Sequence, residues 1–134
     1  MDLSQINYAA VVVAALSAFV IGGIWYSPML FAKAWMAENG FTEESLKGGN
    51  MAVIFGGSFV LSLIMSFNLA AFLGGTPDLV WGITAGALAG IGWVSFSIGI
   101  TYLFERKSMR LFLINAGYHA VTFMVMGAIL GVWK

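Results

Sequence analysis

The sequence predicts an all-α membrane protein with four transmembrane helices and a short interfacial amphipathic helix after the first of them. Of its 134 residues 60% are hydrophobic and only 9% are charged, a composition that no soluble domain of this size can cover with polar surface. Mean hydropathy is +0.93, and the charged residues fall between long apolar runs. We therefore expect residues 1–134 to form a single four-span membrane domain.

The first apolar run predicts a span over about residues 5–26, since no charged residue lies between Asp2 and Lys33. At 1.5 Å per residue such a helix is roughly 30 Å long, enough to cross the hydrocarbon core. No lysine or arginine precedes the run, so it is expected to be a retained helix and not a cleaved signal peptide. Small residues recur along it every four positions, at Ala10, Ala14, Ala18 and Gly22.

The run that follows this span predicts a second, shorter helix over about residues 28–39. Trp25 and Tyr26 are the aromatic types that settle where hydrocarbon meets water. Ser27 followed by Pro28 favours a helix start. The segment is too short to span and suits a helix lying in the interface, although a connector packed on its own bundle explains the pattern equally well. The predicted interface anchors are Trp25, Tyr26, Ser27, Pro28, Lys33 and Trp35.

Three further spans are predicted, over about residues 51–73, 77–104 and 109–133. The run Thr76-Pro77-Asp78 combines a cap, a proline and an acid, which favours a helix start at Pro77. Ser108 is the expected cap of the last span, and Thr42 that of a short helix in the first loop. Glycines at four-residue spacing allow helices to approach closely, and Trp93 and Ser97 are expected to continue the face of the third-span glycines. The predicted helix-packing residues are Gly22, Gly82, Gly86, Gly90, Gly127 and Gly131.

The basic residues predict the topology. The two loops at one side, with the first turn of the last span, carry Lys33, Lys47, Arg106, Lys107 and Arg110, whereas the other side carries only Lys134. The positive-inside rule then places loops 27–50 and 105–108 in the cytoplasm and both termini outside, most simply in a bacterial inner membrane.

Several function classes are disfavoured by what the spans lack. No Asp, Glu, Lys or Arg lies inside a predicted span, whereas a proton-coupled exporter normally needs an intramembrane carboxylate. The net charge of zero gives no basic patch for nucleic acid, and the absence of cysteine removes disulfides and thiolate metal sites. The sequence contains no catalytic set, metal-ligand cluster or phosphate loop, so no catalytic, cofactor-binding or metal-binding residue is predicted.

The polar residues inside the spans predict a layer about nine residues, roughly 13 Å, from the cytoplasmic boundary. If the last two spans form a hairpin, Ser97 lies level with His119 and Thr101 with Asn115. One interpretation is a small polar cavity centred on His119, the only side chain here that titrates near neutral pH. The residue types favour the alternative, in which these groups bond to carbonyls and hold helices together. The candidate cavity residues are His119, Asn115, Ser97, Thr101, Ser62, Ser17 and Trp93.

Two segments also carry a resemblance. The start Ile6-Asn7, the run Gly23-Ile24-Trp25-Tyr26-Ser27-Pro28 with Phe31, Lys33, Trp35 and Met36 after it, and the segment Asn115-Ala116-Gly117-Tyr118-His119 resemble an uncharacterised bacterial and fungal family of small four-helix membrane proteins, catalogued as domain of unknown function 1761. The resemblance covers nearly the whole chain and implies this architecture. It implies no activity.

The leading functional hypothesis is therefore a protein that binds or passes a small, uncharged or weakly polar solute near His119. The second is a structural or accessory subunit that packs through the Gly and Ala faces, and the third is a membrane-embedded enzyme. The expected partners are the lipid bilayer, an unidentified small-molecule ligand and a second copy of the chain, most simply in a dimer. No nucleic-acid partner and no cofactor is expected.

Overall fold

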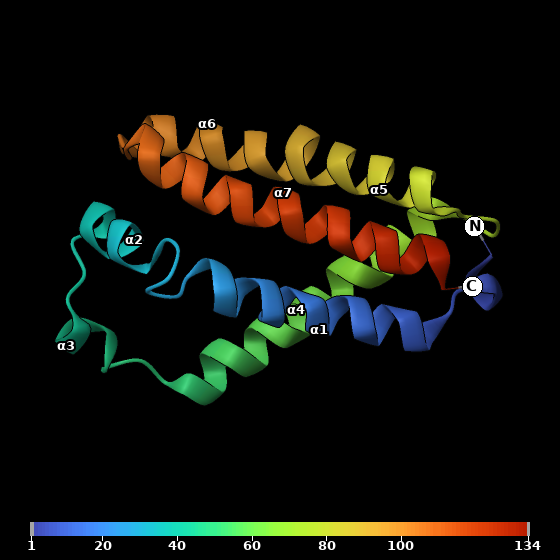
Figure 1. Cartoon of the computed structure of the whole chain (residues 1–134), viewed down its shortest axis with the longest axis horizontal. Coiled ribbons are helices and arrows are strands. Elements are labelled where there is room, and N and C mark those ends of the chain that lie inside the picture. Colours follow the sequence, from blue (N-terminus) through green and yellow to red (C-terminus); the bar gives the residue numbers. More distant parts are fainter. Residues whose placement is uncertain (1, 134) are drawn as a thin grey trace.

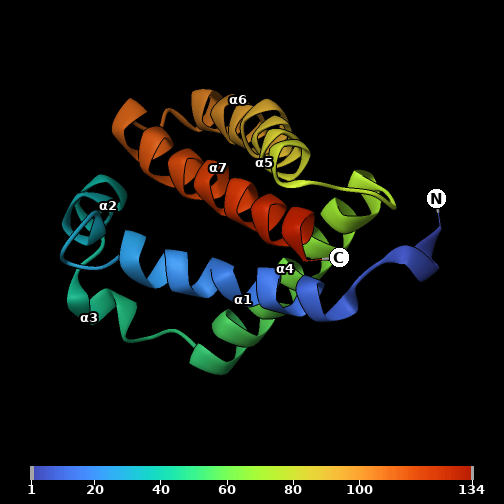
Figure 2. The same cartoon turned by 45° about the vertical axis from the view of Figure 1, so that its right-hand side comes forward.

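The computed structural model describes residues 2–133, and over that range it is helical, with no β-strand. Four helices are long and apolar enough to cross a membrane, as expected of a multi-pass membrane protein. Figure 1 shows α4 (Met51–Leu73) crossing α1 (Tyr8–Trp25) obliquely while the other spans run beside α1, and Figure 2 shows the same crossing from another side. The predicted all-α, four-span fold class is confirmed. The spans are α1 (Tyr8–Trp25), α4 (Met51–Leu73), the continuous helix Leu79–Glu105, and α7 (Met109–Val132).

Side-chain caps set where the spans begin. Asn7 accepts the Ala10 N–H at 3.1 Å and caps α1, so this helix begins after a separate short 3₁₀ turn, η1 (Leu3–Gln5). Asp78 accepts the Trp81 N–H at 2.7 Å and starts α5 (Leu79–Ala87), two residues beyond the expected start at Pro77. An aspartate at the N-cap satisfies a free N–H more strongly than the upstream threonine could from two residues away.

The connection after α1 differs from the expected one. The helix in the first loop, α2, covers Ala32–Asn39, so the expectation of a helix start at Pro28 is wrong. The Ser27 hydroxyl donates to the Ile24 carbonyl at 2.7 Å and closes the end of α1 in place of capping a new helix. Turns fill the interval, because the Phe31 N–H donates back to the Trp25 carbonyl at 3.0 Å. Whether α2 lies in the membrane interface stays a prediction.

A second short helix, α3 (Glu43–Leu46), follows in the same loop. Thr42 caps it, and the Thr42 and Ser45 side chains each accept the other residue's backbone N–H, at 3.1 and 2.8 Å. This reciprocal pair satisfies two of the free donors at the start of the helix.

The third span changes its winding in the middle. Between α5 and α6 (Phe96–Glu105) the eight residues of η2 (Leu88–Ser95) form a π-helix, in which hydrogen bonds join residues five apart. The Ser95 hydroxyl is buried and donates to the carbonyls of Gly90 at 2.7 Å and Ala116 at 3.1 Å. Ser95 therefore continues the face that carries Gly90, and Ser97, expected on that face from the α-helical period, is exposed.

Glycines bring α5 and α7 into backbone contact. A Cβ at Gly82 would lie against the Gly127 carbonyl and 3.2 Å from the Gly131 Cα, and one at Gly86 would lie 2.9 Å from the Met124 Cα. Any side chain there would have to push the two helices apart. Such contact compensates for the weak hydrophobic drive between helices in lipid.

The core gathers at the end of the bundle that holds both termini (Figure 1). There the second half of α4 packs on α1, and the buried Ser66 hydroxyl donates to the Val11 carbonyl at 2.9 Å. The first half of α4 projects away, and residues 51–58 are all exposed. Buried apolar residues from all four spans form this core: Ala10, Val11, Ala14, Ala18, Leu69, Leu73, Ala85, Ala89, Phe123, Met126 and Leu130.

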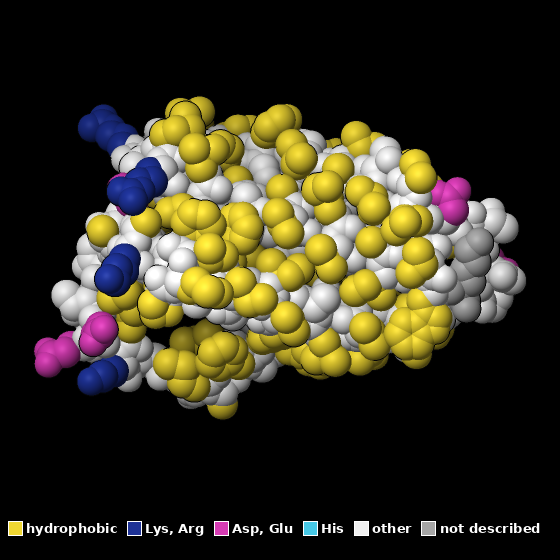
Figure 3. Space-filling model, viewed as in Figure 1, with side chains coloured by type: hydrophobic (Ala, Val, Ile, Leu, Met, Phe, Trp, Pro, Cys, Tyr) yellow, Lys and Arg dark blue, Asp and Glu magenta, His cyan; other side chains and the backbone are white. Residues whose placement is uncertain are grey.

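Charged side chains divide between the two ends of the molecule. Figure 3 shows a broad apolar surface between an end that carries lysines, arginines and some acids and an opposite end where only acids are visible. Lys134, the single base expected at that opposite end, lies outside the described residues. At the basic end Arg110 on α7 lies 3.9 Å from Glu38 on α2, and because the Arg110 side chain is largely exposed the pair contributes little to stability.

Replacing Gly127 by alanine is expected to destabilise the protein, because the added Cβ meets the backbone of Gly82 and no flexible side chain can yield. Overpacking of this kind costs about 1–3 kcal/mol. Denaturant unfolding in detergent micelles measures the loss. Gly56→Ala in α4 is the matched control, because a Cβ at Gly56 meets nothing within 4 Å. Equal stability of the two variants would contradict the α5–α7 contact.

Candidate functional site

The residues expected to surround His119 do not come together. Ser97, Thr101 and Trp93 lie on an outward face of the third span, with Trp93 65% exposed and its ring 6.1 Å from that of Phe72. Ser17 on α1 turns back on its own helix and donates to the Ala14 carbonyl at 2.6 Å. The side chains of the predicted polar layer therefore point in different directions.

His119 itself is half-buried on α7. Its ring lies edge-on to that of Tyr118, with centroids 5.0 Å apart. Its Nδ1 and the hydroxyl of the fully buried Thr122, one turn further on, have no hydrogen-bond partner among residues 2–133. His119 lines none of the cavities described below.

Asn115 belongs to a different arrangement, a chain of side-chain hydrogen bonds across three helices. The Tyr26 hydroxyl, just beyond the end of α1, donates to Asn115 Oδ1 at 2.7 Å. Asn115 Nδ2 in turn donates to the Tyr102 hydroxyl on α6 at 2.8 Å. The Asn115 carboxamide on α7 thus accepts a hydrogen bond from one tyrosine and donates one to the other. We call these three residues the Tyr-Asn-Tyr chain.

Two more polar contacts join α1 to α7 beside this chain. Trp25 Nε1 donates to the Ile114 carbonyl at 2.9 Å, and the Tyr118 hydroxyl donates to the Ala18 carbonyl at 2.9 Å. Gly117 leaves room for the indole, since a Cβ there would lie 3.0 Å from the Trp25 ring. Trp25 and Tyr26, expected as anchors facing the interface, are thus half-buried against α7.

The aromatic rings continue from this contact into the first loop. Tyr26 lies edge-on to Tyr118 on one side and to Trp35 of α2 on the other, at 5.4 and 5.8 Å between centroids. Trp25 also packs on Phe31 at 5.0 Å. Of the remaining expected anchors, Lys33 and Pro28 are exposed. The loop is therefore held to the bundle by aromatic side chains, while its lysine faces outward.

A cleft of about 560 Å³ opens where the first half of α4 leaves α1. Figure 3 shows the molecule hollowed above the projecting start of α4. Its walls are aromatic and aliphatic, and two tyrosines and two serines are among the lining residues. No charged side chain of the described residues lines it. The lining residues of this α1–α4 cleft are Ala18, Phe19, Gly22, Gly23, Tyr26, Trp35, Ile54, Phe55, Ser58, Ser62 and Tyr118.

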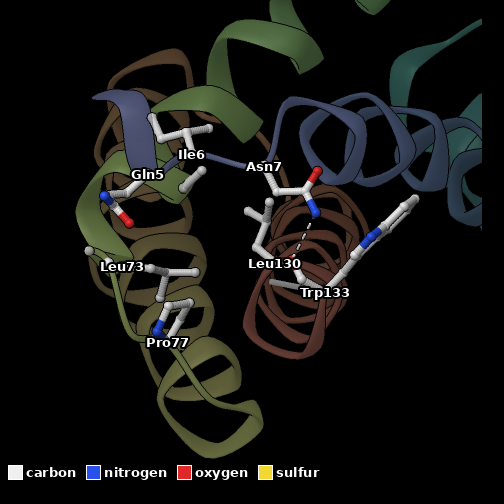
Figure 4. Close-up of a pocket in the computed structure, with 10 residues that line it drawn as sticks. Gln5, Ile6, Asn7, Leu73, Pro77, Leu130 and Trp133 are labelled. Carbon is white, nitrogen blue, oxygen red and sulfur yellow. Dashed lines mark hydrogen bonds between the residues drawn. The ribbon is translucent and has the colours of Figure 1, made fainter. Parts of the chain in front are cut away.

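A smaller, more polar pocket of about 160 Å³ lies at the other end, beside the termini. Figure 4 shows it between the segment before α1, the α4–α5 loop and the end of α7, with Asn7 Nδ2 donating to the Trp133 carbonyl at 3.3 Å. Gln5 and the Gly74-Gly75 turn also line it. The Asn7 side chain also caps α1 with its oxygen, so both ends of its carboxamide are engaged at helix ends.

The described residues offer no set of ligands for a metal ion, since no three His, Asp or Glu side chains cluster between residues 2 and 133. The chemistry available in the cleft is therefore that of hydroxyl groups and aromatic rings, which bind by hydrogen bonding and apolar contact.

The family described as Protein of unknown function (DUF1761) matches residues 9–131. The chain belongs to this family. No curated protein and no solved structure matches the chain. The DUF1761 match takes in all four spans, except the first residue of α1 and the last of α7, and both segments that join α1 to α7, which confirms the family resemblance seen in the sequence.

The α1–α4 cleft of this DUF1761 protein has no signal in the sequence, because nothing in an apolar run reports how far a helix leans from its neighbours. The Tyr-Asn-Tyr chain has a weak signal. Counting along the spans places Asn115 and Tyr26 near the same membrane boundary, and a buried carboxamide needs more partners than a hydroxyl.

Tyr26→Phe is expected to lower the free energy of unfolding by about 1 kcal/mol, because it removes one hydrogen bond and leaves Asn115 Oδ1 without its donor. A double-mutant cycle with Asn115→Ala should give a coupling energy of about 0.6 kcal/mol, typical of such bonds in membranes. Tyr8→Phe is the control, since its hydroxyl donates to an exposed carbonyl. A coupling energy of zero would show that the hydrogen bond between Tyr26 and Asn115 does not stabilise the protein.

Proposed function

We propose that this DUF1761 protein binds a small, amphipathic and uncharged molecule in the α1–α4 cleft. The observation that carries the proposal is the cleft itself, about 560 Å³ with aromatic walls and several hydroxyl groups. Its size falls in the range of small-molecule sites, and a mostly apolar lining with a few polar groups is their usual composition.

The polarity of the cleft supports an uncharged ligand. Tyr26 and Tyr118 donate their protons to Asn115 and Ala18, so their oxygens remain available to accept a hydrogen bond from a ligand hydroxyl. Phe19 and Phe55 face an apolar portion of the ligand. A charged group would have no counter-ion among the lining residues.

Access is proposed to be lateral, from the bilayer. Within the described chain the first half of α4 has no neighbouring helix on its outer side, and residues 51–58 are exposed, so this wall meets lipid. The ligand is placed beside Tyr118, one position before His119, in contrast to the His119-centred cavity suggested by the sequence.

Gly23→Leu tests the cleft, because Gly23 lines it and a Cβ there meets nothing within 4 Å. In liposomes, a monoacylglycerol with a diazirine in its acyl chain should label residues near Phe19 and Phe55 of the wild-type protein on illumination. The leucine should reduce this labelling about tenfold, equivalent to about 1.4 kcal/mol of binding energy. Peptide mass spectrometry locates and quantifies the label.

Two variants serve as controls for this experiment. Gly57→Leu places the same side chain in open space on α4, outside the cleft lining, and should leave labelling unchanged. His119→Ala should also leave it unchanged. Labelling lost equally in Gly57→Leu, or abolished by His119→Ala, would contradict a cleft-bound ligand.

A second candidate function is that of an accessory subunit or a homo-oligomer. It is favoured by Gly56 and Gly57 on α4, where a Cβ would meet no atom within 4 Å, although small residues typically mark helix–helix contacts in membranes. A partner helix, from a second copy in a dimer or from another protein, would fit there. Crosslinking in intact membranes that gave only monomer would count against the dimer.

We also propose that loops 27–50 and 105–108 face the cytoplasm of a bacterial inner membrane, with both termini outside. The support is the gathering of lysine and arginine side chains at one end of the molecule (Figure 3), which the positive-inside rule assigns to the cytoplasm. In the sequence these loops and the first turn of α7 carry Lys33, Lys47, Arg106, Lys107 and Arg110.

The chain lacks cysteine, so single-cysteine variants report the topology directly. Gly75→Cys, in the α4–α5 turn, should react with a membrane-impermeant maleimide applied to intact cells whose outer membrane is permeabilised. Lys47→Cys should react only after the inner membrane is lysed. The reverse pattern, read by a gel shift, would invert the proposed orientation.

A further inference from the structure

A second hollow lies at the basic end of the bundle, in the hairpin that joins α6 to α7. It is a groove of about 290 Å³ between the last turns of α6 and the first turns of α7. It is separate from the α1–α4 cleft, with which it shares no lining residue. We call it the hairpin groove.

The floor of the hairpin groove is apolar. Gly99 lets the Phe112 ring pack closely from across the hairpin, since a Cβ there would lie 3.1 Å from Cε2 of Phe112, and both residues line the groove. Ile100 and Leu103 are 61% and 78% exposed and stand at its sides. An apolar groove on a lipid-facing surface is suited to a hydrocarbon chain lying along the helices.

The mouth of the groove is basic. Lys107 in the turn lines it and is exposed, and within residues 2–133 it makes no ion pair, whereas Arg110 is 3.9 Å from Glu38. The turn and the first residues of α7 hold three bases, Arg106, Lys107 and Arg110, against the single acid Glu105. An anion at the mouth thus meets a net positive charge.

We propose that the hairpin groove binds one anionic phospholipid, with an acyl chain against Gly99, Ile100 and Phe112 and its phosphate beside Lys107. The groove runs from the apolar side of α6 to the charged turn, which is the order of groups along a lipid from chain to headgroup. A basic residue near the bilayer surface attracts anionic lipid with about 1 kcal/mol.

The occupant follows from the two parts of the groove together. A free phosphate ion would meet Lys107 but make no use of the apolar floor, and a zwitterionic lipid would occupy the floor with no net attraction to the basic turn. Only a lipid that carries a net negative charge uses both.

Native mass spectrometry of the delipidated, detergent-solubilised full-length protein tests the proposal. Phosphatidylglycerol is titrated against phosphatidylcholine of the same chains. The wild-type protein should bind one phosphatidylglycerol in preference, and Lys107→Gln should weaken that binding about fivefold, the factor that corresponds to one basic contact. Lys33→Gln removes an exposed base at the same end, outside the groove, and should leave the affinity unchanged.

A second variant tests the apolar half of the site. Gly99→Leu fills the groove and should lower phosphatidylglycerol binding further than Lys107→Gln does, while Lys107→Gln, at an exposed position, leaves the packed helices untouched. Equal weakening by Lys107→Gln and Lys33→Gln would overturn the proposal, as would equal binding of the two lipids. Inorganic phosphate that displaces phosphatidylglycerol at millimolar concentration would show that a free anion is the occupant, and would also overturn it.

Discussion

The contact between the glycines of α5 and α7 governs the rest of this structure. Lipid chains are as apolar as the helices they surround, so helices in a bilayer associate through close packing, and here the backbones of Gly82 and Gly127 meet directly. This contact fixes α7 on the third span. The other side of α7 then receives α1, through Trp25 and Tyr118.

The packing of α4, the second span, is uneven along its length. α4 packs on α1 through its second half, where Ser66 bonds to the Val11 carbonyl, whereas its exposed first half projects away and reaches α1 through the Phe55 ring, 6.5 Å from that of Phe19. A helix fixed at one end and separated from its neighbour at the other leaves a wedge-shaped space, which is the α1–α4 cleft. The hairpin groove lies between the last turns of α6 and the first turns of α7, where the Phe112 ring packs closely on Gly99. Both hollows therefore arise at the basic end, away from the glycine contact.

The fold class could be predicted because its signals, such as apolar length and the Ser108 cap, act within a few turns of helix. The surroundings of His119 could not be predicted in this way. Counting residues along a span gives the depth of a side chain in the membrane, but a cavity also requires that side chains from different helices point toward one another. In the third span the π-helix changes that direction. With an α-helical period, Ser97 would lie on the same helix face as Gly90, two turns later. The wider turns of η2 place Ser95 on that face instead, and its hydroxyl donates to the Ala116 carbonyl of α7. A π-helix has no reliable sequence signal, so only the structure could show the change of face.

The Tyr-Asn-Tyr chain and the contacts beside it join the two segments on which the sequence resemblance rests. The segment around Trp25 and Tyr26 and the segment from Asn115 to Tyr118 are far apart in sequence but form the two sides of one interface. A larger residue at Gly117 would displace the Trp25 indole, and a shorter one at Asn115 would leave Tyr26 unpartnered. A substitution in either segment therefore disturbs contacts made by the other. Among relatives, substitutions in one segment are expected to be matched by compensating substitutions in the other, so that the pair evolves as a single unit.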